Sequence, residues 1–219
     1  MRRFFMQSGL LGGMGFLAGM AIAAPAQAFT LSGFTTTGAT MSGMEITVNY
    51  LNGGAETVLW KTTGAESGGA FGSGWSLSLA GNSYFGAPWL LETDAGFTRA
   101  IASLRINAIP GNTVFDIDDN DYKTPGSAQG FPFLLDSGRG PDAFAYLTDI
   151  AGAQDDLKGV LTLQWHQGFL GSMGFWADTD NGTANEPVRA VETAPEPTTI
   201  AGLALAAAGF AGVRRRRPA

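Results

Sequence analysis

Between residues 29 and 185, apolar residues recur at every second position in short runs that glycine-rich turns separate. This period of two is typical of strands that have one buried and one wet face, and no segment shows a helical period. Met44, Ile46 and Val48 alternate with polar residues in this way, and Asn52-Gly53-Gly54 then supplies the turn of a hairpin. The pattern predicts an all-β passenger domain, specifically an antiparallel β-sandwich that is jelly-roll-like.

The predicted domain comprises residues 29–185, which is long enough to bury a core without cysteines. Residues 118–142 are too polar and too rich in Gly and Pro for a strand and predict a long loop, and long ordered loops tend to be functional. Residues 186–194 show no hydrophobic periodicity and predict a linker. The expected strands are eight or nine in number and include residues 44–50, 56–62, 75–80, 97–109, 114–117, 143–148, 160–165 and 169–177.

Composition excludes several classes of function. The chain has no cysteine and a single histidine, His166, so disulfides, zinc-thiolate sites and paired-histidine metal sites are ruled out. Residues 29–194 contain seven basic and 18 acidic residues. A surface with this charge repels nucleic acid and anionic lipid and attracts cations, so we expect no nucleic-acid partner.

The N-terminus carries an export signal. Arg2 and Arg3 precede a long apolar run that ends in Ala26-Gln27-Ala28, the small-x-small pattern that signal peptidase cleaves, so residues 1–28 predict a signal peptide. An uncleaved membrane helix is the alternative, which Pro25 disfavours because it breaks the helix before this site. The paired arginines also resemble a twin-arginine signal, but the usual flanking polar residue is missing, which favours the general secretory route.

The C-terminus, residues 195–219, has three ordered features. Pro195-Glu196-Pro197 comes first, an apolar segment at residues 200–213 follows, and Arg214, Arg215, Arg216 and Arg217 close it. Fourteen apolar residues make a short transmembrane helix, about 21 Å long at ~1.5 Å per residue. The arginine cluster would keep its end cytoplasmic and leave the passenger domain outside.

This ending resembles the PEP-CTERM sorting signal in the Pro-Glu-Pro motif, in the Thr-Thr-Ile-Ala-Gly-Leu-Ala opening of the apolar segment and in the terminal arginine run. The resemblance implies recognition by an exosortase in a Gram-negative bacterium. It also implies a transient membrane anchor and display at the cell surface or in the extracellular space, commonly beside exopolysaccharide. A plain tail anchor is the alternative. The resemblance covers about 25 residues and is silent on the passenger domain.

Two acidic clusters are candidates for calcium binding. Asp116, Asp118 and Asn120 alternate in the first cluster, and Asp178 and Asp180 belong to the second. Calcium takes six to eight oxygen ligands, which such side chains supply. Neither cluster matches an EF-hand, because the glycine and the distal glutamate of that motif are missing. Ordinary solvated turns are the alternative for both.

Carbohydrate chemistry provides the remaining candidates. Trp89 lies beside Pro88 in a turn-like stretch and is the candidate for an exposed sugar-stacking platform. A glycosidase would need two carboxylates across a cleft, and the glutamates here all lie on polar strand faces or in turns. The sequence has no Gly-x-Ser-x-Gly motif whose serine His166 could activate as a base, which favours a structural role for His166.

These observations predict an exported, non-enzymatic surface or matrix protein with no catalytic residues. Its expected partners are signal peptidase and exosortase, with extracellular polysaccharide and bound calcium as further candidates. A secreted carbohydrate-active enzyme of the glycoside hydrolase type, or a sugar-binding module, is the alternative.

Overall fold

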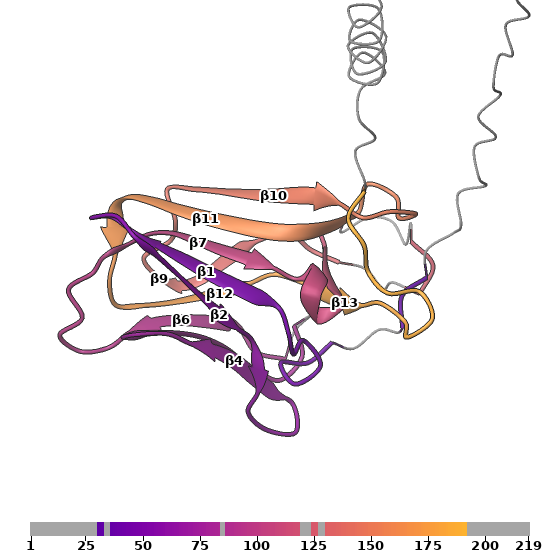
Figure 1. Cartoon of the computed structure of the whole chain (residues 1–219), viewed down its shortest axis with the longest axis horizontal. Helices are drawn as coiled ribbons and strands as arrows, with labels where there is room; N and C mark the ends of the chain where they lie inside the picture. Colours follow the sequence, from indigo (N-terminus) through magenta and orange to yellow (C-terminus); the bar gives the residue numbers. More distant parts are fainter. Residues whose placement is uncertain (1–29, 33–35, 84–85, 119–123, 127–129, 192–219) are drawn as a thin grey trace, which may run out of the picture.

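The structure, a computed structural model, describes residues 30–32, 36–83, 86–118, 124–126 and 130–191. These residues form two antiparallel sheets that pack face to face (Figure 1), which confirms the prediction of an all-β fold. The signal peptide at 1–28, with Ala26 and Ala28, and the tail at 195–219 lie outside the described residues.

The seven-stranded sheet has the order β13-β8-β11-β7-β1-β2. The seventh strand, β10, pairs with β11 along the edge opposite to β7. Its longest strand, β11, pairs with β7 in the register that places Leu161 opposite Ile106 and Leu163 opposite Leu104. Its strands are β1 (Glu45–Tyr50), β2 (Ala55–Leu59), β7 (Ile101–Asn107), β8 (Thr113–Asp116), β10 (Ala143–Asp149), β11 (Leu157–Phe169) and β13 (Thr179–Asn181).

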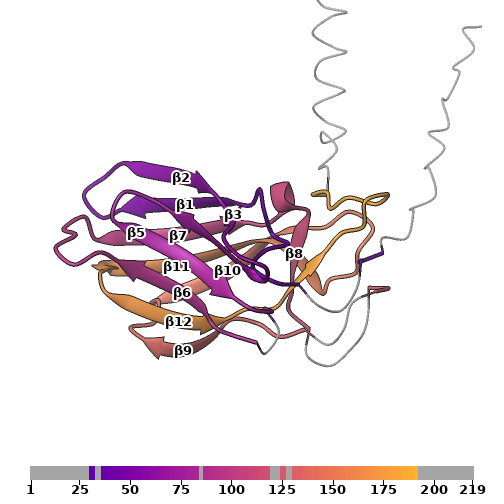
Figure 2. The same ribbon diagram turned by 90° about the horizontal axis from the view of Figure 1, so that it is seen from below.

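The six-stranded sheet has the order β3-β4-β5-β6-β12-β9. Figure 2 shows β6, β12 and β9 side by side along its border. Its strands are β3 (Lys61–Thr62), β4 (Ser67–Phe71), β5 (Trp75–Ala80), β6 (Trp89–Thr93), β9 (Leu134–Gly138) and β12 (Ser172–Trp176), and one 3-10 turn, η1 (Ile109–Gly111), joins β7 to β8 in the other sheet.

The core lies between the sheets and is rich in aromatic rings. Trp89 stacks on Phe175 with centroids 5.9 Å apart and meets Trp60 at 5.2 Å. The indole N–H groups of Trp60, Trp89 and Trp165 donate to backbone carbonyls, for example from Trp60 to Gly38 at 2.7 Å, and that of Trp75 donates to the Glu56 carboxylate. Satisfying these N–H groups is what allows such large side chains to be fully buried.

The structure divides or reassigns two of the predicted segments. Residues 56–62 divide at the buried Trp60 into β2 and β3, which belong to different sheets. Residues 118–142, predicted to be one long loop, contain β9. Its five residues are all exposed at the sheet border, so the buried and wet alternation that identifies a strand in sequence is absent there.

The sandwich also continues past residue 185 into the predicted linker at 186–194. Val188 is buried, and its N–H donates to Asn112 Oδ1 at 2.8 Å. Ala190 forms a bridge with Ile150. A single buried valine and one bridge leave no periodic pattern, which is why the sequence did not reveal this packing.

Candidate metal centre

Three aspartates meet where β8 pairs with β13. In this antiparallel pair, Thr179 lies opposite Phe115 and Asp180 opposite Val114. The next position brings Asp178 opposite Asp116, whose N–H donates to the Asp178 carbonyl at 3.2 Å. Alternate residues of a strand share a face, so all three carboxylates belong to one side of the pair.

The carboxylates of Asp116, Asp178 and Asp180, here called the aspartate triad, are close together and shielded from water. Their relative exposures are 2%, 5% and 4%. One oxygen from each lies within 4.8 Å of the others. Two ligand oxygens on the same calcium ion can be about 5 Å apart, because each lies 2.3–2.6 Å from the metal. The triad therefore has the spacing of ligands that share one cation.

Burial and mutual repulsion disfavour the state in which all three carboxylates of the triad are ionised. Burial, followed by the charges of Asp180 and Asp116, raises the pKa of Asp178 to about 8. The Thr179 N–H and the Ser83 hydroxyl act in the opposite direction without outweighing them. At neutral pH the triad thus favours either a bound proton or a bound cation.

Asp156 shows how this fold compensates a buried carboxylate with hydrogen bonds. Its side chain is 2% exposed and accepts two hydrogen bonds from Thr124, one from the N–H and one from the hydroxyl, both at 2.9 Å. Donors on both oxygens compensate for lost hydration. Asp178 has a weaker neighbour, since the Ser83 hydroxyl lies 3.4 Å from its Oδ1. The two sites therefore differ in chemistry as well as position.

A buried tyrosine hydroxyl is coupled electrostatically to Asp178 of the triad. The Tyr146 hydroxyl, on β10, is buried without a hydrogen bond of regular geometry, and the Phe133 backbone, a weaker partner, acts to lower its pKa. Burial raises the pKa of Tyr146, and the negative charge of Asp178 contributes to the rise, so the hydroxyl lies within its electrostatic reach. An unsatisfied buried hydroxyl costs about 1–3 kcal/mol.

The loop that follows β8 packs directly on the triad. The Asp118 N–H donates to Asp116 Oδ1 at 3.2 Å, and the Gly130 N–H donates to the Asp118 carbonyl at 3.0 Å. A Cβ at Gly130 would lie 2.4 Å from Asp116 Oδ1, so only glycine allows this approach. The structure thus brings the two predicted acidic clusters together through Asp116, Asp178 and Asp180. Asp118 lies beside them, and Asn120 falls outside the described residues.

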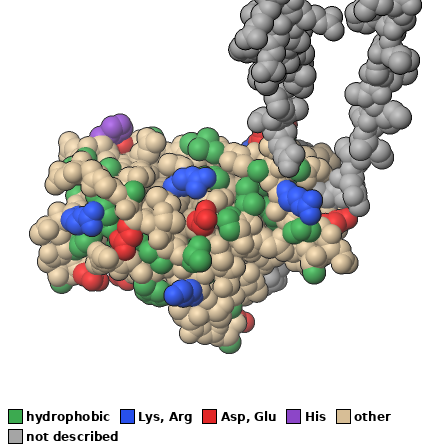
Figure 3. Space-filling model, viewed as in Figure 1, with side chains coloured by type: hydrophobic (Ala, Val, Ile, Leu, Met, Phe, Trp, Pro, Cys, Tyr) green, Lys and Arg blue, Asp and Glu red, His purple; other side chains and the backbone are tan. Residues whose placement is uncertain are grey.

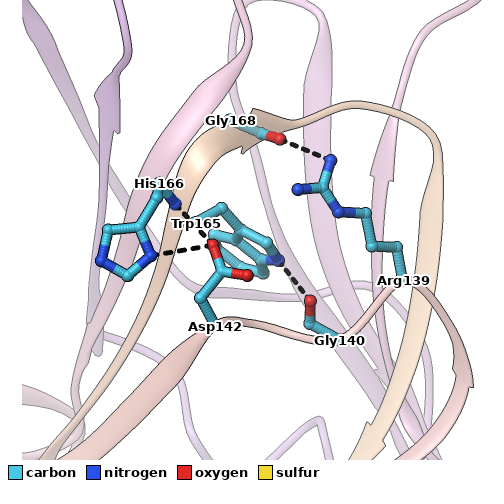
Figure 4. Close-up of polar contacts among 6 residues, drawn as sticks. All are labelled: Arg139, Gly140, Asp142, Trp165, His166 and Gly168. Carbon is cyan, nitrogen blue, oxygen red and sulfur yellow. Dashed lines mark hydrogen bonds and ion pairs between the residues drawn. The ribbon is translucent and has the colours of Figure 1, made fainter.

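His166 has a structural role in the contacts that the structure describes. Its backbone N–H donates to Asp142 Oδ2 at 2.6 Å, and its ring Nδ1 lies 3.1 Å from the same oxygen (Figure 4). The Trp165 indole donates to the Gly140 carbonyl, and Arg139 donates to the Gly168 carbonyl, both at 3.0 Å. These bonds hold the chain between β9 and β10 against β11. The backbone N–H of His166 is the main cause that lowers the Asp142 pKa.

Glu56 is held in a similar structural network at the edge of the sandwich. Its carboxylate accepts hydrogen bonds from the Tyr50 hydroxyl at 2.7 Å, the Trp75 indole at 3.0 Å and the Ser73 N–H at 3.0 Å. Burial acts to raise its pKa, but the hydrogen bonds from these donors outweigh it and lower the pKa. A carboxylate held ionised in this way links the two sheets and is unsuited to act as a general acid.

Trp89 is not the exposed platform that the sequence predicted. It begins β6, is 0% exposed and donates its indole N–H to the Ala177 carbonyl at 3.0 Å. Pro88 before it gives the segment a turn-like appearance, although proline is common at the first residue of a strand. Conversely, sequence reasoning missed Ser83 and Gly130, because only tertiary contacts bring them to the triad.

Among the described residues, no helix has the length and hydrophobicity needed to span a membrane. Figure 3 shows basic and acidic side chains interspersed on one face of the sandwich. That distribution offers no broad basic surface on this face for nucleic acid.

Comparison with known proteins identifies the tail. A family model, the PEP-CTERM protein-sorting motif, matches residues 193–217, which confirms the resemblance seen in Pro195-Glu196-Pro197 and the arginine run. No curated protein and no solved structure matches the chain. The motif implies export, processing by exosortase and sorting to the cell surface of a Gram-negative bacterium. The chain is therefore a protein that carries the PEP-CTERM sorting motif, attached to an all-β passenger of two antiparallel sheets.

Proposed function

We propose that this chain is a non-enzymatic surface protein whose sandwich, a jelly-roll-like scaffold, binds calcium and associates with extracellular polysaccharide. The observation that carries the calcium proposal is the aspartate triad, in which Asp116, Asp178 and Asp180 are nearly fully buried with ligand oxygens within 4.8 Å. The sorting motif accounts for export and display and is independent of this site.

The chemistry of the triad favours calcium over other metals. All three ligands are hard carboxylate oxygens, whereas zinc and copper sites use imidazole and thiolate ligands that a chain with one histidine and no cysteine lacks in pairs. Magnesium requires near-ideal octahedral geometry and keeps several waters. A buried set of three carboxylates suits the larger, more weakly hydrated ion.

The same geometry supports a structural rather than a catalytic role. Glycosidase carboxylates flank a cleft that admits a sugar and are about 5–5.5 Å or 6.5–9.5 Å apart. The residues of the triad are instead buried, and at most 5% of any of them is exposed. A substrate would have to displace the sandwich interior to reach it.

Thermal unfolding in EDTA and in millimolar calcium tests the metal proposal. Calcium that binds only the folded state stabilises it by about 2.7 kcal/mol when its concentration is 100 times the Kd. We expect calcium to raise the Tm of the wild type, and Asp116→Asn or Asp180→Asn to abolish the rise. Glu66→Gln, at an exposed glutamate outside the triad, is the matched control and should keep it. An equal Tm in EDTA and calcium would refute the proposal.

A further inference from the structure

The outer face of the six-stranded sheet differs from an ordinary solvated sheet face. Cross-strand partners share a face, so its middle row runs Gly69, Ser78, Leu90 and Gly174 across four strands. The adjacent row continues from Phe71 through Ser76 and Glu92 to Ser172. Apart from Phe71, Leu90 and Glu92, the residues of these rows are glycine or serine, which rise little above the sheet. Ser76, Ser78 and Leu90 are partly exposed, whereas neighbouring side chains bury Gly69 and Gly174.

Two aromatic rings lie on this face toward its two sides, one on β4 and one on β12, each one strand in from the border. Phe71, on β4, is 55% exposed, and its ring covers Gly69, where a Cβ would lie 2.8 Å from the ring. Trp176, on β12, is partly exposed, two positions after the outward-facing Gly174. Its indole N–H donates to Asp136 Oδ1 at 3.1 Å, which fixes the orientation of the ring. Trp60, Trp75, Trp89 and Trp165 are at most 2% exposed.

The two rings define a diagonal across the sheet. Three strand spacings separate β4 from β12, about 14 Å at ~4.8 Å per spacing. Trp176 lies four residues along β12 from Ser172, which belongs to the Phe71 row, a further ~14 Å. The diagonal of about 20 Å passes over Ser78 and Leu90 and could accommodate several pyranose units of a sugar chain.

The polar groups on this face fit a neutral polysaccharide. Serine hydroxyls of β5, β9 and β12 and the carboxylate of Glu92 lie beside the diagonal and can bond sugar hydroxyls. The charges are those of Glu92, Asp136 and, at the β3 border, Lys61, so an acidic polymer gains no attraction. Aromatic planes stack on the apolar faces of sugar rings.

The outer face of the other sheet provides an internal comparison. It presents hydroxyl and amide side chains that bond each other, such as Thr47 with Thr57 and Asn49 with Ser103, both at 2.9 Å. Arg105 and Thr162 are opposite one another on the same face. The cross-strand rows of this face contain no aromatic ring among the described residues. Exposed hydroxyls are thus common to both faces, whereas the ring pair is confined to one.

We propose that the outer face of the six-stranded sheet binds a neutral polysaccharide strand along the diagonal from Phe71 to Trp176. This inference rests on the proposed association with extracellular polysaccharide and gives it a site. It is independent of calcium at the triad, which lies in the pairing of β8 with β13.

Affinity electrophoresis of the full chain in mild detergent tests this site, with soluble neutral β-glucan, xylan and galactomannan as probes and alginate as the acidic comparison. We expect retardation by at least one neutral polymer and none by alginate. Trp176→Ala and Phe71→Ala should each weaken the binding about tenfold. Thr57→Ala, on the opposite sheet face, is the matched control and should bind as the wild type does.

A second variant guards against loss of folding. Ser78→Glu leaves both rings in place and adds bulk and charge at the middle of the diagonal, and it too should weaken binding about tenfold at an unchanged Tm. Wild-type binding that survives all three changes would overturn this site but keep the association with polysaccharide. No wild-type binding to any neutral polymer would overturn both, whereas the calcium result would stand.

Discussion

Asp178→Asn should change the stability of this protein in opposite directions with and without calcium. Burial and the neighbouring carboxylates raise the pKa of Asp178 from 3.8 to about 8. Between these values the folded state binds a proton that the unfolded state does not, so the contribution of Asp178 to stability falls as pH rises. At pH 7.5 this linkage destabilises the metal-free protein by about 5 kcal/mol, at ~1.36 kcal/mol per pKa unit.

Asparagine has nearly the same shape and no charge, so in EDTA the variant escapes this cost. We expect a gain of about 2–4 kcal/mol, less than the full linkage because the new amide must find hydrogen-bond partners. For a domain of this size, that gain corresponds to a Tm higher by roughly 5–15 °C. In millimolar calcium the variant lacks one anionic ligand, and the calcium-induced rise in Tm should shrink or vanish.

The assay is thermal unfolding at pH 5, 6.5 and 7.5, in EDTA and in calcium. In EDTA, the advantage of Asp178→Asn over the wild type should grow with pH across this range. A variant that is less stable than the wild type in EDTA at pH 7.5 would refute the view that the triad is electrostatically unfavourable without a cation. Glu66→Gln again serves as the control, because its side chain lies outside the triad.

Three further predictions concern the sandwich itself. Glu56→Gln should lower stability near pH 7 but flatten the acid branch below about pH 4.5 in urea titrations, because the lowered Glu56 pKa gives stability that is lost as pH falls through it. A chain ending at residue 185 should be less stable to urea than one ending at 191 by about 2 kcal/mol, since it loses the buried Val188. Gly174→Ala should cost about 1–3 kcal/mol in the same assay, because its Cβ would lie 2.6 Å from Ser137 Oγ; an unchanged midpoint would contradict the packing of β9 on β12.

Features that depend on a few consecutive residues were predictable from the sequence. The sorting motif is a local signal, and the family match at residues 193–217 confirms it. The alternation through Met44, Ile46 and Val48 fixes a strand because a period of two buries one face whatever its partner is. Both acidic clusters were likewise visible, since carboxylates gather within short stretches of chain.

Only the tertiary structure decided which of these features meet. Asp116 and Asp178 are 62 positions apart in the chain, and it is the register of β8 with β13 that brings them together. The tertiary structure also decided which of Trp89 and Trp176 is exposed. Each lies next to an aromatic or apolar residue in a β segment, and the packing of the sheets buries Trp89 and leaves Trp176 partly exposed. Burial and ligand spacing depend on long-range pairing, which local periodicity does not encode.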